Sequence, residues 1–361
     1  MSLHLPDPVP PSAPMPHRKV IRSWLLPVTQ RSTSRALALV ALDLILFGLA
    51  ISATVCLQNI AAKLLSGLIA GFIIGRLFIL GHDACHQNFT PHRRLNRWLG
   101  RLVFLPSLTP YSLWDVGHNV VHHGYTNLKG VDFVWQPYSL DEFRALPRWR
   151  QRLERVYRSG CGSWLYYLIE MWWLRMYFPS RRRMPSRRPV FFWDGVLVTV
   201  AAISWSGALS AAAIVTEQSA WLTLLAGFVM PLLFWNAMIG FVVYVHHTHI
   251  DVAWHDEKTA WAAAQPFVST TVHLSFRYGI GSLLHHIMEH TAHHVDMSIP
   301  LYRLRQAQQI LEAMLPQRIV IQRFSWRWYF DTARRCKLYD FQRHCWTDFN
   351  GRPSSEPAMA T

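Results

Sequence analysis

The sequence has few charged residues for its length. Only 16% of its 361 residues are Asp, Glu, Lys or Arg, whereas 51% are hydrophobic. Soluble domains usually carry about 25% charged residues. This shortage argues against an ordinary soluble domain and directs attention to the long apolar runs.

Cysteine is also scarce, and no two cysteines have the C-x-x-C spacing. The five are Cys56, Cys85, Cys161, Cys336 and Cys345. An iron–sulfur or rubredoxin-like module needs clustered cysteine ligands, so none is expected to be fused to this chain. A disulfide framework is not expected either, because the charge pattern described below makes most of the polar chain face the cytoplasm.

The first residues lack the pattern of a secretory signal peptide, which has an early apolar core before a small-residue cleavage site. They are rich in proline, as in "PDPVPPSAPMP", and then basic. We expect residues 1–34 to form a disordered, basic tail.

Long apolar runs are what the sequence has instead, at about 35–56, 63–80, 190–215 and 220–245. Each approaches the ~20 residues that a helix needs to cross a hydrocarbon layer about 30 Å thick. Buried helices of a soluble protein are the alternative, but these runs lack a polar face. The sequence therefore predicts four membrane spans in two hairpins. They lie within a domain of residues 35–310, which a cytoplasmic extension of residues 311–361 follows.

The net charge of +15 raises the possibility of a nucleic-acid partner, but the positions of the basic residues argue against it. They cluster before the first and third spans, at Arg18, Lys19, Arg22, Arg31, Arg35, Arg181, Arg182, Arg183, Arg187 and Arg188, whereas the loops at 57–62 and 216–219 hold neither Lys nor Arg. Basic residues gather on the cytoplasmic side of membrane proteins, where they face anionic lipid. Both termini and the long middle segment are therefore predicted to be cytoplasmic.

Most of the 19 histidines fall into four clusters. The clusters are "HDACH" (His82, His86), "HNVVHH" (His118, His122, His123), "HHTH" (His246, His247, His249) and "HHIMEHTAHH" (His285, His286, His290, His293, His294). Residues three or four apart share one face of a helix. We therefore expect three sets each to point imidazoles in one direction: His82 with His86, His118 with His122, and His290 with His293 and His294.

The predicted topology brings these clusters together. The first begins where the second span ends, and the third begins where the fourth span ends, so all four clusters can meet in one layer beside the membrane. Neutral imidazole is the commonest nitrogen ligand for metals, and a single tetrahedral ion needs only four ligands. Eight or nine converging imidazoles therefore indicate two metals, and imidazole alone leaves Zn, Cu, Fe and Ni open.

Three clusters resemble the histidine boxes of the membrane fatty acid desaturase superfamily, H-x(3-4)-H, H-x(2-3)-H-H and H-x-x-H-H. They are "HDACH" (82–86), "HNVVHH" (118–123) and "HTAHH" (290–294). The segments "TPYSLWDVGHNVVHH", "VVYVHHTH" and "HTAHHVDMSIPLYRL" are similar to the acyl-lipid, Δ12/ω-type branch. The resemblance covers about residues 40–310.

The resemblance implies an all-α integral membrane protein whose cytoplasmic helical cap holds two non-haem iron ions. It also implies O2 as co-substrate and an external electron donor, a ferredoxin or a cytochrome b5-like protein. Carried over by position, the ligands would be His82, His86, His118, His122, His123, His290, His293 and His294. The family usually adds one ligand from the end of the fourth span, and His247 or His249 matches it.

The implied reaction is O2-dependent desaturation of fatty acyl chains in membrane lipids, with no catalytic residue separate from the metal site. A hydroxylase or acetylenase with the same centre stays open. "HDACH" is also similar to the H-E-x-x-H of zinc proteases, but Asp83 replaces the glutamate base. A metal transporter would place its site near the membrane midplane, whereas the histidines of this chain cluster outside the predicted spans.

Two further expectations concern the surroundings of the site. Asp83, Glu289 and Asp296 are candidates to orient metal-bound imidazoles, because carboxylates often accept the second ring N–H. Arginine outnumbers lysine, which favours a bacterial protein of the inner membrane.

Overall fold

The structure, a computed structural model, describes residues 6–177, 179–184 and 186–358 of the chain. The chain forms two compact units. The hairpin unit consists of Arg31–Gly117 and Tyr167–Gly240, and the histidine unit consists of Met1–Gln30, His118–Tyr166 and Phe241–Thr361. Each unit is therefore assembled from segments that are distant in the sequence.

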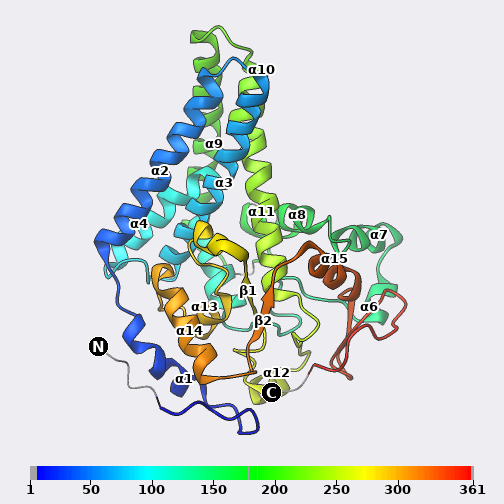
Figure 1. The fold of residues 1–361 in the computed structure, drawn as a ribbon. Helices are drawn as coiled ribbons and strands as arrows, with labels where there is room; N and C mark the ends of the chain where they lie inside the picture. The colour runs from blue at the N-terminus through cyan, green and yellow to red at the C-terminus, as the bar shows by residue number, and fades with distance from the viewer. Residues whose placement is uncertain (1–5, 178, 185, 359–361) are drawn as a thin grey trace. The chain divides into compact units, whose positions relative to one another are not determined.

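Long apolar helices make up most of the hairpin unit (Figure 1). They are α2 (Thr33–Cys56) and α3 (Ile60–Cys85) in the first hairpin, and α9 (Pro189–Val215), α10 (Ala220–Leu224), the π-helical turn η5 (Leu225–Val229) and α11 (Met230–His247) in the second. The end of α11, from Phe241 onwards, belongs to the histidine unit. Among the described residues, four helices are long and apolar enough to cross a membrane. The four predicted spans are confirmed, and α3 continues past its predicted end at residue 80 to include His82.

Polar side chains define where these helices begin. The Asn59 side chain accepts a hydrogen bond from the Ala62 N–H at 3.0 Å at the start of α3, and Ser219 accepts one from the Leu222 N–H at 3.4 Å at the start of α10. Such caps satisfy backbone N–H groups that a helix leaves without a partner. The turns between the spans therefore fall where the sequence changes from apolar to polar.

Helix α3 packs closely against the second hairpin through glycines. A Cβ atom at Gly67 would lie 2.3 Å from the Ala226 carbonyl oxygen, and one at Gly71 would lie 2.8 Å from Phe234 Cβ. Small residues allow helix backbones to approach closely in membrane proteins. The close approach fixes α3 in the unit and with it the two histidines at its C-terminal end.

Shorter helices complete the hairpin unit. They are α4 (Arg93–Phe104), the 3-10 turn η2 (Leu105–Ser107), α5 (Tyr111–Asp115) and the π-helix η4 (Tyr167–Tyr177), which follows α8 (Ser163–Tyr166) in the chain. Asp194 of α9 accepts hydrogen bonds from the Arg101 side chain and from the Ser112 backbone N–H, both at 2.9 Å. This carboxylate therefore joins α4 and α5 to the third span.

The histidine unit contains shorter helices and a few strands. Its remaining helices and helical turns are α1 (Arg18–Leu25), η1 (Leu26–Val28), α6 (Leu140–Ala145), α7 (Arg148–Tyr157), α12 (Lys258–Ala264), η6 (Arg277–Leu284), α13 (His290–Val295), η7 (Leu301–Arg303), α14 (Leu304–Met314) and α15 (Trp326–Arg335). The π-helix η3 (Val116–His122) spans the boundary between the units. The expected domain limit at residue 310 falls inside α14.

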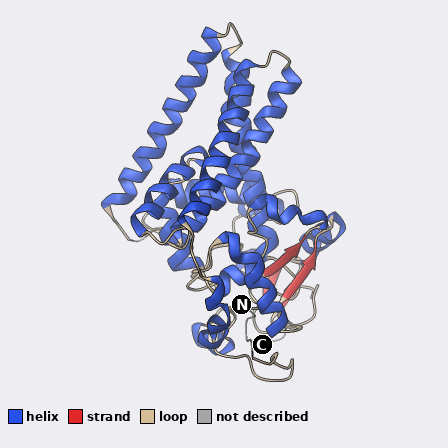
Figure 2. Cartoon of the chain, turned by 60° about the vertical axis from the view of Figure 1, so that its left-hand side comes forward, coloured by secondary structure: helices blue, strands red, loops and turns tan. Residues whose placement is uncertain are grey.

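The strands form two small sheets, so the all-α expectation holds for the main architecture but misses these elements. Helices nevertheless make up most of the chain (Figure 2). Strands β1 (Val272–Ser275) and β2 (Val320–Arg323) pair in parallel, and β3 (Leu338–Asp340) and β4 (Cys345–Thr347) pair antiparallel. A buried cluster lies beside the second pair and consists of Trp254, Cys336, Tyr339, Phe341 and Trp346. Strands of three or four residues are too short to give a clear alternating pattern.

The expectation of a disordered segment over residues 1–34 is wrong for Arg18–Leu25, which forms α1. Ile21, Trp24 and Leu25 are buried on one face of this helix, and His17 accepts a hydrogen bond from the Lys19 N–H at 3.2 Å at its start. The i, i+3, i+4 spacing of these residues is helical, but two turns are too short to be stable alone. Tertiary packing supplies what the local sequence lacks.

Candidate metal centre

The second histidine box lies on a π-helix, and this decides which of its histidines point together. The His123 N–H donates to the His118 carbonyl at 2.9 Å, which is the i to i+5 bond of a π-helix. The His118 and His123 Nε2 atoms are 3.0 Å apart. The expected pairing of His118 with His122 is therefore wrong, because an α-helical spacing does not apply here.

The histidines of the second and third boxes, together with His247 from the end of the fourth span, form two groups within the histidine unit. The four-histidine group consists of His122, His247, His290 and His294, all buried, and the three-histidine group consists of His118, His123 and His293. Within each group the nitrogens that could bind a metal lie within 4.8 Å of one another. The expectation that His293 points with His290 and His294 is also wrong, since the third box divides between the groups.

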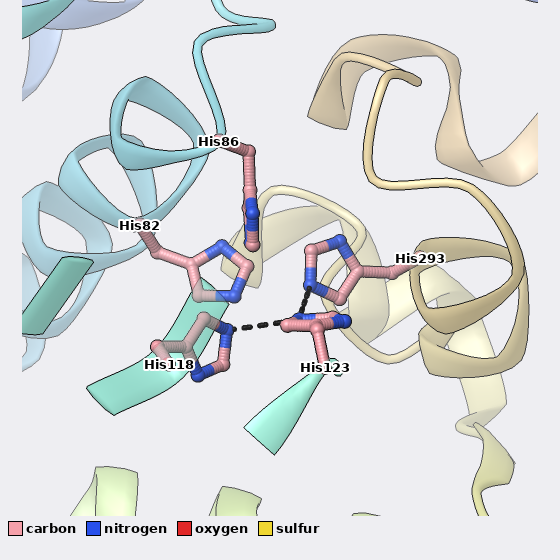
Figure 3. Close-up of side chains that lie close together, drawn as sticks. All are labelled: His82, His86, His118, His123 and His293. Atoms are coloured by element: carbon pink, nitrogen blue, oxygen red, sulfur yellow. Dashed lines mark hydrogen bonds between the residues drawn. The ribbon is translucent and has the colours of Figure 1, made fainter. Parts of the chain in front are cut away.

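The ring nitrogens in each group approach one another directly. His247 and His290 bring their Nε2 atoms to 3.0 Å, and the His293 Nε2 lies 3.1 Å from the His123 Nε2 (Figure 3). Nitrogen ligands lie about 2.0–2.1 Å from a bound metal, so two ligands at right angles are roughly 3 Å apart. The donor set and its spacing therefore fit a metal ion in each group.

Burial keeps several of these rings in the neutral form that binds metals. Burial and the neighbouring imidazoles lower the pKa of His290 and His294 well below the ordinary value of 6.5, and they lower the pKa of His293 to about 3. A buried imidazolium would have neither water nor a counter-charge to stabilise it. These three rings are therefore poised to donate a lone pair at neutral pH.

A carboxylate that the sequence did not single out orients one ring. Asp132, fully buried, has its two oxygens 3.0 and 3.1 Å from His122 Nδ1, and it accepts the Asn127 N–H at 2.9 Å. The bond to Nδ1 leaves the Nε2 lone pair for a metal. Asp132 lies ten residues after His122, a separation that no helical or strand period links to the box.

Hydrogen bonds also orient His294 but not through the carboxylates that we expected. The Thr126 hydroxyl lies 3.2 Å from His294 Nδ1. Glu289 instead lies 3.1 Å from His286 Nδ1, and Asp296 lies 4.0 Å from Arg22. Asp83 is buried in the hairpin unit. The orienting groups observed here are therefore Asp132 and Thr126.

The first box belongs to the hairpin unit. His82 lies on the last turn of α3 and His86 is its C-cap, and their ring centroids are 4.7 Å apart. The Trp114 ring packs edge-on against His82 at 5.1 Å. An apolar helix thus ends in two imidazoles that an aromatic side chain holds in place.

The remaining histidines have other surroundings. His249, one of two candidates for an additional ligand, lies outside both groups, with its Nε2 3.3 Å from the Gln322 side-chain oxygen. His246 lies against Met288 Sδ at 3.3 Å and stacks on the His290 ring. His285 is buried in the turn before α13. Of the two candidates at the end of the fourth span, His247 is therefore the one beside the third box.

Comparison with known proteins covers the segment that holds these histidines. A model of the fatty acid desaturase family matches residues 58–326. The chain belongs to the fatty acid desaturase family. The matched segment of this desaturase-family chain contains both histidine groups together with His82 and His86.

Several curated relatives carry related names. The chain is 28% identical over 236 residues to an sn-1 oleoyl-lipid 12-desaturase of Arthrospira platensis, covering 65% of this chain and 64% of the relative. It is 29% identical over 276 residues to a chloroplastic omega-6 fatty acid desaturase of Glycine max, covering 76% and 62%. It is 28% identical over 258 residues to an sn-1 acyl-lipid omega-3 desaturase (ferredoxin) of Synechocystis sp., covering 69% and 67%.

These names agree with the acyl-lipid, Δ12/ω-type branch that the sequence resembles. The match spans less than two thirds of the length of the first two relatives.

Proposed function

We propose that this chain is a membrane-bound oxidoreductase that introduces a double bond into fatty acyl chains of membrane lipids. The observation that carries the proposal is the four-histidine group. In it, buried neutral imidazoles from the second box, the third box and the end of the fourth span face one another. Such a cluster has no evident structural purpose without a cation, because buried polar groups otherwise find complementary partners.

The proposed ligand sets follow the two groups. One metal is bound by His122, His247, His290 and His294. The other is bound by His118, His123 and His293 of the histidine unit. The family resemblance adds His82 and His86 of the first box to the proposed ligands. Both metals are iron in this proposal, because the reaction needs a redox-active ion and zinc is redox-inactive.

Metal ions held by these histidines would supply the O2-dependent chemistry that removes hydrogen from an unactivated methylene. The protein orients their ligands through Asp132 and Thr126 and excludes water by burying His290, His293 and His294. Each turnover takes two hydrogens from the acyl chain, two electrons from a donor and two protons from solution, and it reduces O2 to two waters. No separate acid or base is assigned.

The substrate and the orientation in the membrane follow from the four apolar helices. An acyl lipid lives in the layer that these helices cross, and the fourth of them ends at His247, so we expect the acyl chain to be supplied from the membrane. We place the active site on the cytoplasmic side of a bacterial inner membrane, because basic residues precede the first and third spans. Reporter fusions in the turn at 216–219 should read external, and fusions after Val295 should read internal. An external C-terminus contradicts this orientation.

Electrons come from a separate acidic donor in this proposal, a ferredoxin or a cytochrome b5-like protein. Support comes from the basic charge of the chain and from the printed name of the Synechocystis relative, which includes ferredoxin. Sustained turnover with NAD(P)H alone would contradict an external donor.

Expression in a host that lacks polyunsaturated lipids tests the function directly. Mass spectrometry of the lipids should reveal acyl chains that have lost two hydrogens, whereas an added oxygen would assign a hydroxylase instead. An unchanged lipid profile, with iron bound at both sites and a competent donor present, would reject the proposal.

A further inference from the structure

A cavity of about 460 Å³ in the histidine unit joins the surface to two of the proposed metal ligands. His123 of the three-histidine group and His294 of the four-histidine group both line it. Its outer wall includes His17, Arg18, Lys19 and Arg22, from the N-cap and body of α1. A basic surface therefore lies over the histidines of both groups.

Hydrogen bonds hold α1 directly against the third histidine box. The Arg18 side chain donates to the carbonyl oxygens of His294 at 2.6 Å and of Val295 at 3.1 Å. Arg22 donates to the same Val295 carbonyl at 2.9 Å. Two arginines thus cap the C-terminal end of α13, where the helix dipole favours positive charge. The position of the basic helix is fixed relative to the candidate ligands.

The cavity wall is electropositive. Among the described residues that line it, three are cationic, Arg18, Lys19 and Arg22, and none is acidic. Asp296 is the acid recorded near this wall, 4.0 Å from Arg22. Three cations against one carboxylate leave a net positive field, which attracts an acidic partner.

A short bonded route connects the cavity wall to a candidate ligand. The Trp261 indole N–H donates to the Thr126 carbonyl at 2.9 Å, and the Thr126 hydroxyl lies 3.2 Å from His294 Nδ1. Trp261, Thr126 and His294 all line the cavity. Thr126 is therefore the one residue that links the Trp261 indole to the His294 imidazole, beneath a partner bound over the opening.

We propose that α1 and this cavity form the docking site for an acidic ferredoxin, which passes electrons to the metal centre by way of His123 and His294. The inference rests on the proposed function, because it needs a redox-active centre. Reduced ferredoxin carries one electron, so it docks and is oxidised twice for each double bond. Those two electrons, with two protons and the two hydrogens from the acyl chain, complete the reduction of O2 to two waters.

An anionic membrane surface is the competing use of these basic residues. The docking role is favoured because the basic wall belongs to the same cavity as His123 and His294, and because Arg18 bonds to the carbonyl of a candidate ligand. A surface that only attracted lipid would gain nothing from either feature.

Lys19→Glu is the informative variant. Lys19 is exposed and lines the cavity, whereas Arg18 and Arg22 bond to the third box, so their replacement would also disturb the metal site. Arg327→Glu makes the same charge change at an exposed position on α15 and serves as the control. Lys19→Arg keeps the positive charge and should bind ferredoxin as tightly as the unmodified protein does.

The full-length protein in nanodiscs, loaded with iron, is titrated with purified plant-type ferredoxin. Lys19→Glu should weaken ferredoxin binding and raise the KM for ferredoxin by about tenfold at low ionic strength, with the difference shrinking at high salt. Iron content and the KM for lipid should stay as in the unmodified protein. Arg327→Glu should bind ferredoxin normally.

Equal binding by Lys19→Glu and the unmodified protein, or an equal loss in Arg327→Glu, would overturn the docking site. Weaker adsorption of Lys19→Glu to anionic vesicles, with ferredoxin affinity unchanged, would reassign the surface to lipid. If ferredoxin binds and Lys19→Glu weakens it, yet no double bond forms with any reductant, docking stands and the proposed function fails.

Discussion

The two units of the molecule treat their buried polar groups in opposite ways. In the hairpin unit, charges are paired with charges: Asp43 of α2 lies 2.7 Å from the Arg76 guanidinium of α3, and both are nearly inaccessible. In the histidine unit, imidazole nitrogens face one another, as the Nε2 atoms of His247 and His290 do at 3.0 Å. The first arrangement pairs opposite charges, whereas the second brings together nitrogen atoms whose lone pairs suit a cation.

This difference indicates that the buried ion pair stabilises the fold, whereas the buried histidines are suited to bind metal. An ion pair inside an apolar helix bundle is costly to desolvate and is tolerated because each charge satisfies the other. His123 Nε2 lies 3.0 Å from His118 Nε2 and 3.1 Å from His293 Nε2, so three imidazole nitrogens converge at the spacing of ligands around one metal ion. Removing a partner should therefore cost stability in the hairpin unit and metal in the histidine unit.

Loss of a ligand is expected to have the largest effect. His294→Ala should reduce desaturation to the background of the assay, because it removes one of four nitrogens from the four-histidine group. The loss should exceed the roughly 10–100-fold that follows removal of an outer partner. Lipid profiling and iron analysis of the purified variant measure it, and iron should fall by at least one of two ions.

His92→Ala and His344→Ala are the controls for this variant. Both positions lie outside the two histidine groups, and His92 is exposed. They should retain iron and activity. Near-normal product from His294→Ala with full iron content would remove the assignment of the four-histidine group.

Loss of a buried charge in the other unit should affect stability instead. Arg76→Leu leaves the fully buried Asp43 without its guanidinium, and such a change costs about 3–5 kcal/mol of unfolding free energy. The double variant with Asp43→Leu should recover most of that loss, because an apolar pair fits the helix interface. Unfolding in detergent measures both. A single variant as stable as the unmodified protein would refute the comparison between the units.

An outer partner should have an intermediate effect. Asp132→Asn removes the charge that holds the His122 N–H, and metal affinity should fall about 10–100-fold. Competition against a chelator measures the affinity. Glu289→Gln is the matched control, since Glu289 bonds to His286, which belongs to neither group. Equal weakening by the two variants would mean that Asp132 has no special role.

The sequence predicted the features that depend on local pattern. Run length alone located the four spans, since each apolar stretch closely matches one helix. Box spacing located the ligand candidates, and the basic flanks gave the orientation that we propose. Box spacing and the basic flanks each depend on residues that lie within one or two helical turns of one another in the sequence.

The division of the histidines between two groups depends on backbone geometry that spacing does not reveal. The i+4 rule assigned His118 to His122, but a π-helix pairs His118 with His123. Asp132 reaches His122 only because the chain turns back between them. Helix α1 depends on packing against the third box, through Arg18 and Arg22. Tertiary contacts decided each of these points.

Acidification should have the smallest effect on metal binding. The pKa of His293 is lowered to about 3 by burial and by nearby imidazoles, against about 6.5 in an unfolded chain. Protons therefore compete poorly with metal at pH 5.5, and dialysis at pH 5.5 rather than 7.5 should lower iron content by less than about twofold. Loss of most of the iron at pH 5.5 would mean that these rings are not shielded.

The same pKa shift has the opposite consequence for the metal-free protein. Between pH 6.5 and about 3, the unfolded chain binds a proton at His293 that the folded chain does not bind. Stability is therefore fully present above pH 6.5 and is lost as the pH falls towards 3, by about 1.4 kcal/mol for this residue at pH 5.5. Thermal unfolding of metal-free protein at pH 7.5 and 5.5 should reveal a lower Tm at pH 5.5. His293→Gln, which removes the titrating group, should narrow that difference, whereas the exposed His92→Gln should leave it unchanged. A Tm difference that is the same in both variants would place the acid sensitivity outside the histidine groups.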